Sequence, residues 1–519
     1  MRHFTAELVL LCVLLTVLLS GCGGREKTLT PAVTEVPAET GTETLSGTPT
    51  GTPAPSLTPT SSLTPTPTPV PDPIGSPTPT PDYTGVLAAY EETLETVSEK
   101  MEELAKKKDL PIISVTTEDG RIISEKNYTV SVVDLYNCGE EFALSGLTAE
   151  IKVRGNSTAD SAPYPYRIRF QDKQNLLGLH EGEKYRSWVL LKPTWNLCPD
   201  YVAHRVARVL YEGRYYVSDG CFVNVVMNGQ ELGVYYLCEQ NQAASGRIDV
   251  NEPGEGDTGV LTGYVLELDN YTSDEHPYFY MDFDGVTITD WQGETRTANS
   301  HGYSILSDTR SGAQREFIEN YFRGVWEIVY RGCEKGEAWG FDSEWNLTEL
   351  LDTSAYEAVT AVVDVCSFYN MIILEELCQN YDVGAGSMYF CVDFGEDSLY
   401  PKLTVLSPWD FNWGYGEDAF SGFYATTWQK LWTDNWDRSN IWFITLMKAD
   451  WFREGLFGRW KKVSESGALS EMLDDASSYI ETLRNDEGEN SWRVDCGQEV
   501  IRYVRNRIRY LDSHFTDEE

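Results

Sequence analysis

The sequence lacks the motifs that identify several common enzyme classes. Its 519 residues contain no GxxxxGK[ST] phosphate loop, no HExxH metal site and no GxSxG nucleophile turn. Histidine is scarce, with six residues in the whole chain, and these six are scattered along it. A histidine-based metal site and a Ser/His/Asp triad therefore have little support.

Positive charge and paired cysteines are also in short supply. Lysine and arginine number 41 against 81 aspartate and glutamate residues, which gives a formal net charge of −40. Because binding to nucleic-acid phosphates needs clustered positive charge, this balance argues against a nucleic-acid partner. The eleven cysteines include no CxxC pair, so a disulfide framework and a zinc ribbon are both poorly supported.

The N-terminus has the order of a secretory signal. Arg2 and His3 form a short basic start, and an apolar run from Leu8 to Leu19 follows. The run ends in Leu-Ser-Gly-Cys, which resembles the lipobox of bacterial lipoproteins. The resemblance implies a signal peptide over residues 1–21 and a diacylated Cys22, which would hold an extracytoplasmic chain to the bacterial cell membrane. The alternative is an ordinary signal peptide followed by a chance cysteine.

A linker follows the predicted anchor. Residues 22–82 are dominated by threonine, proline, serine and glycine, with repeats such as the Thr-Pro run at 64–69. Such a segment has almost nothing to bury, so we expect a disordered, semi-extended stalk of about 3 Å per residue. A polar stretch at 83–109 has apolar residues at helical spacing and predicts a helical lead-in.

The remainder, residues 110–515, predicts one large α+β domain. Short β-branched and aromatic runs dominate its first half, and Asn228-Gly229 between two of them is a strong hairpin signal. Helical patterns dominate its second half, with a β insertion at 388–393 and 403–406. The predicted strands are 112–115, 128–133, 149–153, 166–170, 188–191, 222–227, 233–238 and 264–269. The predicted helices are 201–211, 314–330, 353–377, 440–448, 468–484 and 498–512. A β-rich lobe followed by a mainly helical lobe is a bilobal layout.

Two carboxylates carry the clearest chemical pattern. Asp382 lies in a loop after a long apolar helix, and Asp410 follows a strand and precedes Phe411. Phosphoryl-transfer enzymes of the kinase type use a loop aspartate for the acceptor hydroxyl and a second aspartate, after a hairpin, for Mg²⁺. Ser387 stands five residues after Asp382, where protein kinases place another metal ligand. Two alternatives stay open: both aspartates cap turns, or they serve as the acid and nucleophile of a carbohydrate hydrolase.

Six segments in order resemble the CotH (spore coat protein H) kinase family, which has an atypical protein-kinase-like fold. They extend over residues 110–515 and are Ile151–Thr158, Trp188–Leu191, Asn228–Tyr235 with Glu239, Gly263–Asp269, Asn380–Asp382 and Pro408–Phe411. The resemblance implies a bilobal kinase-like fold, ATP as the phosphate donor, and Mg²⁺ or Mn²⁺ as its companion. It makes Asp382 the catalytic residue and Asp410 a metal ligand. Ser387, from the spacing in protein kinases, and Asn412, whose amide oxygen can still ligate Mg²⁺, are further ligand candidates.

Other residues follow as site candidates. Lys152 and Arg154 flank Val153, so on a strand their side chains share one face and can grip phosphates. The full set of nucleotide-binding candidates is Lys152, Arg154, Arg167, Arg169 and Glu239. Glu267 and Asp269 are candidates for the lining of the cleft. The alternatives are solvated charges on strand faces and, for the last two, a structural hydrogen-bond network.

Two departures from the family pattern bear on activity. Asn412 stands where the family has a second acid, which removes one charge from the metal site. Residues 196–201 stand where the family has an arginine-containing segment. The sequence thus predicts a membrane-tethered kinase acting on a Ser/Thr-type hydroxyl of a surface or secreted protein. The alternative is an inactive module that binds a cell-wall polymer, an extracellular polysaccharide or a protein partner.

Overall fold

The computed structural model describes the predicted domain and its lead-in, apart from several short gaps. The described residues are 81–155, 157–192, 197, 199–269, 276–283, 287–289, 295–297, 300–380, 383–384, 386–416 and 440–516. Residues 71–519 belong to one compact unit. Cys22, the predicted signal peptide and stalk, and Asp382 lie outside the described residues. Among the residues described, no helix combines the length and apolar character needed to cross a membrane.

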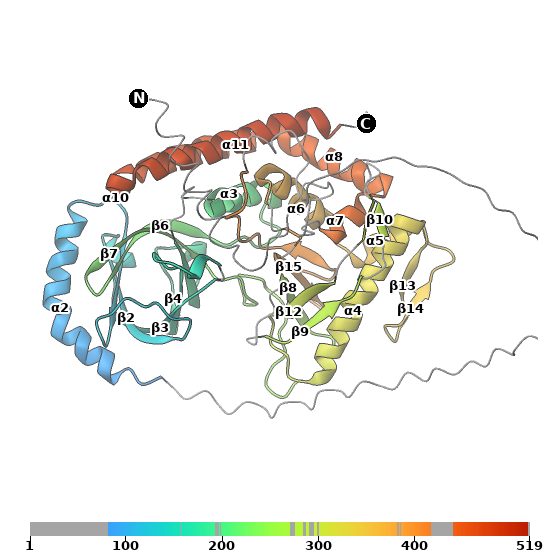
Figure 1. Cartoon of the computed structure of the whole chain (residues 1–519). Helices are drawn as coiled ribbons and strands as arrows, with labels where there is room; N and C mark the ends of the chain where they lie inside the picture. Colours follow the sequence, from blue (N-terminus) through green and yellow to red (C-terminus); the bar gives the residue numbers. More distant parts are fainter. Residues whose placement is uncertain are drawn as a thin grey trace, which may run out of the picture. The chain divides into compact units, whose positions relative to one another are not determined.

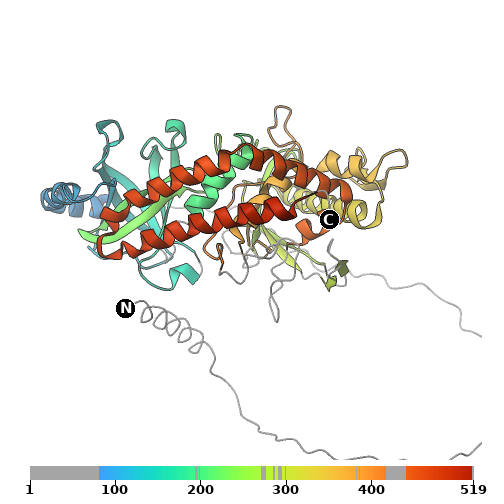
Figure 2. The ribbon, with the colours of Figure 1, turned by 90° about the horizontal axis from the view of Figure 1, so that it is seen from above.

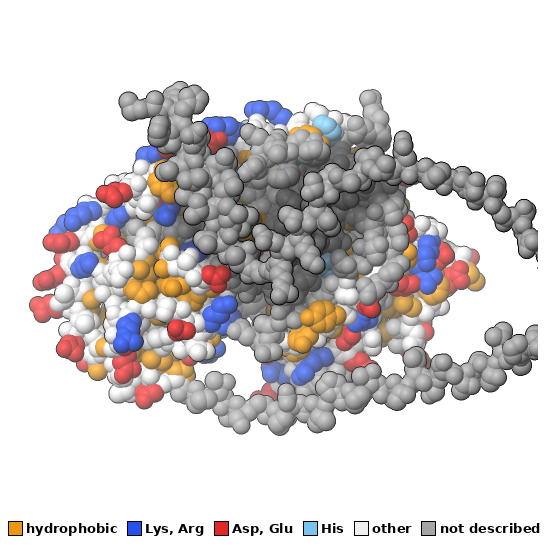
Figure 3. All heavy atoms as spheres, in the orientation of Figure 1, with side chains coloured by type: hydrophobic (Ala, Val, Ile, Leu, Met, Phe, Trp, Pro, Cys, Tyr) orange, Lys and Arg blue, Asp and Glu red, His pale blue; other side chains and the backbone are white. Residues whose placement is uncertain are grey.

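The first half of the domain is a closed β-barrel (Figure 1). Seven strands close in the order β1-β2-β3-β4-β5-β7-β6, with β1 and β6 pairing in parallel. The strands are β1 (Ile112–Thr117), β2 (Thr129–Tyr136), β3 (Leu144–Val153), β4 (Tyr166–Gln174), β5 (Tyr185–Leu191), β6 (Gly220–Met227) and β7 (Gln230–Glu239). The predicted lead-in helix is α2 (Thr84–Ala105), which packs on β1 and β2. Acidic and basic side chains are interspersed over the barrel face in Figure 3, as a charge that serves solubility would be.

Local patterns explain the barrel strands. Alternate residues of β3 and β4, such as Ile151, Val153 and Ile168, are buried in the barrel core, while the polar residues between them face outward. The predicted hairpin is confirmed, because Asn228 (φ +49°) and Gly229 (φ +73°) connect β6 to β7 in the left-handed conformation that such turns need.

The second half contains a five-stranded antiparallel sheet, ordered β16-β15-β8-β12-β9. Its strands are β8 (Gly263–Asp269), β9 (Tyr278–Met281), β12 (His301–Ile305), β15 (Gly386–Asp393) and β16 (Thr404–Leu406). The predicted insertion therefore exists as β15 and β16, but it is not separate, since β15 pairs with β8 from far earlier in the chain. Four shorter strands pair locally: β10 (Thr287–Thr289), β11 (Thr295–Thr297), β13 (Trp339–Phe341) and β14 (Leu347–Glu349).

Helices surround this sheet and the α+β prediction is confirmed. They are α3 (Pro199–Tyr211), α4 (Gly312–Tyr330), α5 (Ala355–Val362), α6 (Val365–Cys378), α7 (Ile441–Leu446), α8 (Asp450–Glu465), α9 (Ala468–Thr482), α10 (Arg484–Glu487) and α11 (Trp492–His514). The single helix predicted over 353–377 is wrong. Asp364 interrupts it, because its carboxylate caps α6 by accepting from the backbone N–H of Cys366 and Ser367.

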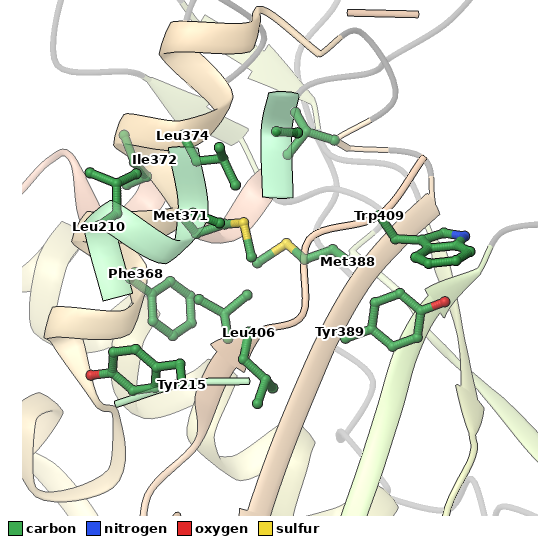
Figure 4. Packing of buried hydrophobic residues seen from close by; sticks show 14 of the residues in the cluster. Leu210, Tyr215, Phe368, Met371, Ile372, Leu374, Met388, Tyr389, Leu406 and Trp409 are labelled. Atoms are coloured by element: carbon green, nitrogen blue, oxygen red, sulfur yellow. The ribbon is translucent and has the colours of Figure 1, made fainter. Parts of the chain in front are cut away.

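Two large hydrophobic cores hold the domain, and two smaller clusters pack α2 against the barrel. One fills the barrel, and the other joins α3, the second sheet and the helices of the second half. Figure 4 shows part of the second core, where Leu210 of α3 lies near Ile372 and Leu374 of α6. In Figures 1 and 2, α11 extends from the barrel side across to the helical side. It is tied to α6 by a fully buried ion pair, with 2.9 Å between Arg507 Nη2 and Glu376 Oε2.

Candidate functional site

A cavity of about 360 Å³ is lined by both the barrel and the second sheet. Five of the predicted site residues line it: Lys152, Arg154, Arg167, Glu267 and Asp269. The chain between the two halves, at Gln240–Gln242, lines it as well, together with Tyr389 of β15. The structure thus brings positive charge from the barrel and negative charge from β8 into one space.

Strand alternation gathers the cations. Lys152 of β3 lies opposite Arg167 of β4, and both side chains are on the outer face because their neighbours fill the barrel core. Lys126, from the loop before β2, is a fourth cation in the cavity and was not among the predicted residues. Arg169 is not among the lining residues. Its guanidinium pairs with Glu150 at 2.6 Å and lies 4.3 Å from the centre of the Tyr128 ring.

Arg154 connects the cavity with the loop that carries Asp410. Its guanidinium carbon lies 5.2 Å from the centre of the Trp409 ring, and its charge favours the ionised forms of both Asp410 and Glu267. Figure 4 shows Trp409 beside Tyr389, which is the cross-strand partner of Glu267. One arginine therefore acts on carboxylates from two different elements.

The two cavity carboxylates lie at alternate positions of β8. Removal from water raises the pKa of Glu267 to about 7, with added repulsion from Asp269 and Asp410. The Tyr389 hydroxyl and Arg154 act against this rise. Ser304 of β12 donates to Asp269 over 3.2 Å. The raised pKa of Glu267 indicates that too little positive charge lies beside its carboxylate to offset burial and the neighbouring aspartates.

Asp410 lies in an unusual turn after β16. Its φ is +61°, and Ser407 and Tyr415 have φ values of +57° each, a conformation that costs a non-glycine residue about 1–2 kcal/mol. Burial raises the pKa of Asp410, while Arg154 and the side chain of Asn412 lower it. The Asn412 amide donates to Asp410 over 2.6 Å. Surrounding contacts must hold this turn in place.

Helix α3 supplies those contacts, and sequence reasoning missed its role. The backbone N–H of Phe411 donates to Asp200 over 3.2 Å, and the hydroxyl of Tyr415 donates to the carbonyl of Pro199 over 2.7 Å. Asp200 is 4% exposed. Its burial, followed by the charge of Asp410, raises its pKa to about 7. The Pro-Asp pair at the helix start was the available signal, since proline favours the first helical position.

His204 holds the same turn from the next turn of α3. Its Nε2 lies 3.2 Å from the carbonyl oxygen of Pro408, which can only accept, so Nε2 carries the proton. Its Nδ1 then accepts from the hydroxyl of Tyr236 at 3.1 Å. Both ring nitrogens are used by the neutral imidazole, and burial lowers the pKa of His204 to about 3.

This pKa predicts an acid-sensitive fold. At pH values between about 3 and the ordinary pKa of 6.5, the unfolded chain binds a proton at His204 that the folded chain does not. The free energy of unfolding therefore falls as the pH falls through this range. At pH 5 the cost is about 2 kcal/mol. Urea unfolding at pH 7.5 and pH 5 should show that the loss is smaller by this amount in His204→Gln. Equal losses in the two proteins would contradict the prediction.

The structure places Glu239 away from the cavity cations. Its carboxylate is fully buried, accepts from Arg247 Nε over 3.1 Å and from the backbone N–H of Asp219 over 2.9 Å, and lies 3.1 Å from His180 Nδ1. Arg247 and His180 line a second cavity of about 520 Å³. Glu239 therefore belongs to an ion-pair network next to the connecting chain rather than to the cavity lining.

The proposed metal ligands are only partly brought together. Asp410 and Asn412 lie side by side, whereas Ser387 (φ +59°) lies at a bulge that begins β15, next to the pair formed by Gly386 and Asp269. Asp382, five residues earlier in the sequence, is outside the described residues. Among the described residues, no group of three or more His, Cys, Asp or Glu side chains is arranged to hold a metal. A single carboxylate still fits Mg²⁺, which takes its other ligands from phosphates and water.

One known family matches part of the second half of the domain. Residues 343–514 match the family described as CotH kinase protein. The predicted resemblance to the CotH kinase family is confirmed. The matching stretch contains Asp410, Asn412 and Ser387, and the barrel cations precede it. No curated protein matches the chain.

Proposed function

We propose that this protein is a CotH-like kinase that transfers the γ-phosphate of ATP to a Ser/Thr-type hydroxyl of a surface or secreted protein. The observation that carries the proposal is the cavity in which barrel cations face β8 carboxylates, with Arg154 linking it to Asp410. The barrel would be the N-terminal lobe of a kinase-like bilobal domain spanning residues 110–515, and the mainly helical half its C-terminal lobe.

The cations would hold the phosphates. Lys152, Arg154 and Arg167 converge on one cavity, and guanidinium groups bind phosphate oxygens in pairs of parallel hydrogen bonds. Lys126 adds a fourth charge. A triphosphate carries about as many negative charges as these four groups supply, and phosphoryl transfer depends mainly on such positioning and charge neutralisation.

A divalent ion and an aspartate would complete the site. Mg²⁺ or Mn²⁺, held by Asp410 with the oxygens of Asn412 and Ser387 as further candidates, would neutralise charge on the phosphates. By the family resemblance, Asp382 orients the acceptor hydroxyl and takes its proton. The acceptor oxygen bonds to the γ-phosphorus, the bond from that phosphorus to the bridging oxygen breaks, and ADP leaves.

The location of the enzyme is part of the proposal. A diacylglycerol on Cys22 would tether the chain outside the cytoplasm, and the threonine- and proline-rich linker of residues 22–82 would give the domain reach toward a protein acceptor. The net charge of −40 supports a partner other than nucleic acid.

An inactive binding module is the second candidate, and one observation favours it. Asn412 stands where the family has an acid, and its amide donates to Asp410 at 2.6 Å, so it engages one oxygen of the metal carboxylate. Such a module would use the fold to bind a cell-wall polymer, an extracellular polysaccharide or a protein partner. It predicts no nucleotide binding.

A transfer assay separates the two candidates. The purified full chain is incubated with ATP labelled at the γ-phosphate, Mg²⁺ or Mn²⁺, and a serine-rich acidic protein. We expect label on the wild type or the acceptor, none with Asp382→Ala, and wild-type label with Asp397→Ala, whose carboxylate is exposed in the turn between β15 and β16. An unlabelled wild type whose melting temperature ATP does not raise would favour the binding module.

A further inference from the structure

We infer that Glu267, Asp269 and the amide oxygen of Asn241 form a divalent-cation site inside the cavity, separate from the ion at Asp410. The role of this cation in holding phosphates rests on the proposed function. The existence of the site rests on the arrangement of β8, β15 and the connecting chain, which does not depend on activity.

The two carboxylates share one face of β8. Glu267 and Asp269 line the cavity, whereas Leu266 and Leu268 between and beside them are buried in the second core. Pairing with β15 fixes both positions, since Glu267 lies opposite Tyr389 and Asp269 opposite Gly386. A rigid central strand of the sheet therefore presents two oxygen ligands to the same space.

Asn241 adds an acceptor with an unmet hydrogen bond. The residue is 3% exposed, lines the cavity, and donates from Nδ2 to the carbonyl oxygen of Ser407 over 3.3 Å. A carbonyl can only accept, so this contact fixes the orientation of the amide. Its Oδ1 has no hydrogen-bond partner among the described residues. Leaving a buried acceptor unpaired costs about 1–3 kcal/mol, which a bound cation would recover.

Charge explains why the ligand is a cation. The carboxylates share the cavity with Lys152, Arg154 and Arg167, so an anion bound by those groups would also face Glu267 and Asp269. Like charges that share one cavity repel each other, and a cation bound between them removes that repulsion. Arg154 alone does not neutralise the two β8 carboxylates, because its positive charge also acts on the carboxylates of Asp410 and Asp200.

The ligand set indicates which cation. Two carboxylates and an amide oxygen are hard ligands that suit Mg²⁺ and Mn²⁺, and these ions take phosphate and water oxygens for their remaining positions. The three proposed ligands offer oxygen atoms, which zinc and copper favour less than Mg²⁺ and Mn²⁺ do, while the imidazole of His276 lines the same cavity and is not among the proposed ligands. The same cation would bridge the β8 carboxylates to a bound phosphate.

Mn²⁺ binding to the full chain, without nucleotide, tests the inference. Electron paramagnetic resonance of free Mn²⁺ gives the number of bound ions. We expect Glu267→Gln with Asp269→Asn to lose one bound ion per chain. Asp410→Ala still binds at least one ion, which the β8 residues hold. Glu349→Gln with Asp352→Asn, an exposed pair with the same loss of charge, keeps the wild-type number. Asn241→Asp should tighten binding of the ion by about tenfold, because it adds a charged ligand.

The number of bound Mn²⁺ ions in each variant supports or overturns the proposed cation site. An unchanged number of ions in the β8 double variant overturns the inference, and water alone then satisfies Asn241. If Asp410→Ala and the β8 double variant each bind no ion at all, the two sets of residues share one ion and the separate site is overturned. If the double variant does not fold, as judged by its melting curve, an unchanged affinity in Asn241→Asp overturns the inference. An inactive wild type that still loses one ion in the double variant leaves the inference standing and removes the proposed function.

Discussion

Replacing Asp410 by alanine is expected to lower the rate of phosphoryl transfer by about 10²–10³-fold or more. The substitution removes the carboxylate that would hold the metal and leaves Arg154 without one of its partners, so charge on the phosphates is no longer neutralised where it develops. The loss should fall on kcat, with a higher Mg²⁺ or Mn²⁺ concentration needed for half-maximal rate. Initial rates of label transfer at several metal concentrations measure both effects.

Asn412→Asp is expected to strengthen the metal site that Asp410→Ala weakens. It restores the second acid of the family pattern and replaces an amide that donates to Asp410 over 2.6 Å, so it should lower the metal concentration for half-maximal rate. Asp397→Ala, in the exposed turn between β15 and β16, serves as the control for loss of one negative charge. A rate in Asp410→Ala equal to that of the wild type, with the same metal dependence, would show that Asp410 holds no metal.

The parts of the site that sequence predicted are those set by local periodicity. The alternation Lys152-Val153-Arg154 placed both cations on one face, and both line the cavity. Arg169 was named with the same group of basic residues, yet its side chain pairs with Glu150 on the neighbouring strand. Alternation fixes the face of a strand, whereas cross-strand neighbours depend on register, which a single strand does not reveal.

The parts that sequence missed depend on contacts between distant segments. Helix α3 was predicted, but its contacts with the Asp410 turn were not. Asp200 and His204 make hydrogen bonds to residues of this turn that are about two hundred positions away in the sequence. The same is true of the second sheet, where β8 pairs with β15 across more than a hundred residues. Glu267 could be named from the family resemblance, while its shared cavity with Arg154 depends on how the second sheet lies beside the barrel.

Glu239 shows how a residue from a family segment can have a structural explanation. It was predicted to act in nucleotide binding. In the structure its carboxylate pairs with Arg247, and both side chains are fully buried. Arg247 also donates to the carbonyl of Ser187 over 3.0 Å and lies 3.8 Å from the centre of the Tyr185 ring. These contacts join β5, β7 and the connecting chain that goes on to line the cavity at Gln240–Gln242.

Arg247→Met is therefore expected to lower the free energy of unfolding by about 3–5 kcal/mol, because it leaves the Glu239 carboxylate buried without its charge partner. Glu239→Gln should cost less, since a neutral amide tolerates burial better than an unpaired charge. The double variant Arg247→Met with Glu239→Gln should recover part of the loss. Denaturant unfolding of the three variants and the wild type measures the change in the free energy of unfolding that each substitution causes.

The same variants decide between the two roles of Glu239. In the structural role, Glu239→Gln lowers stability but leaves KM for ATP unchanged at a temperature where the variant is fully folded. Arg310→Gln provides a control outside this network, because it breaks an exposed ion pair with Asp308 at 2.6 Å and should cost only about 0–1 kcal/mol. A rise in KM for ATP in Glu239→Gln without loss of stability would contradict the structural role and show that Glu239 acts in nucleotide binding.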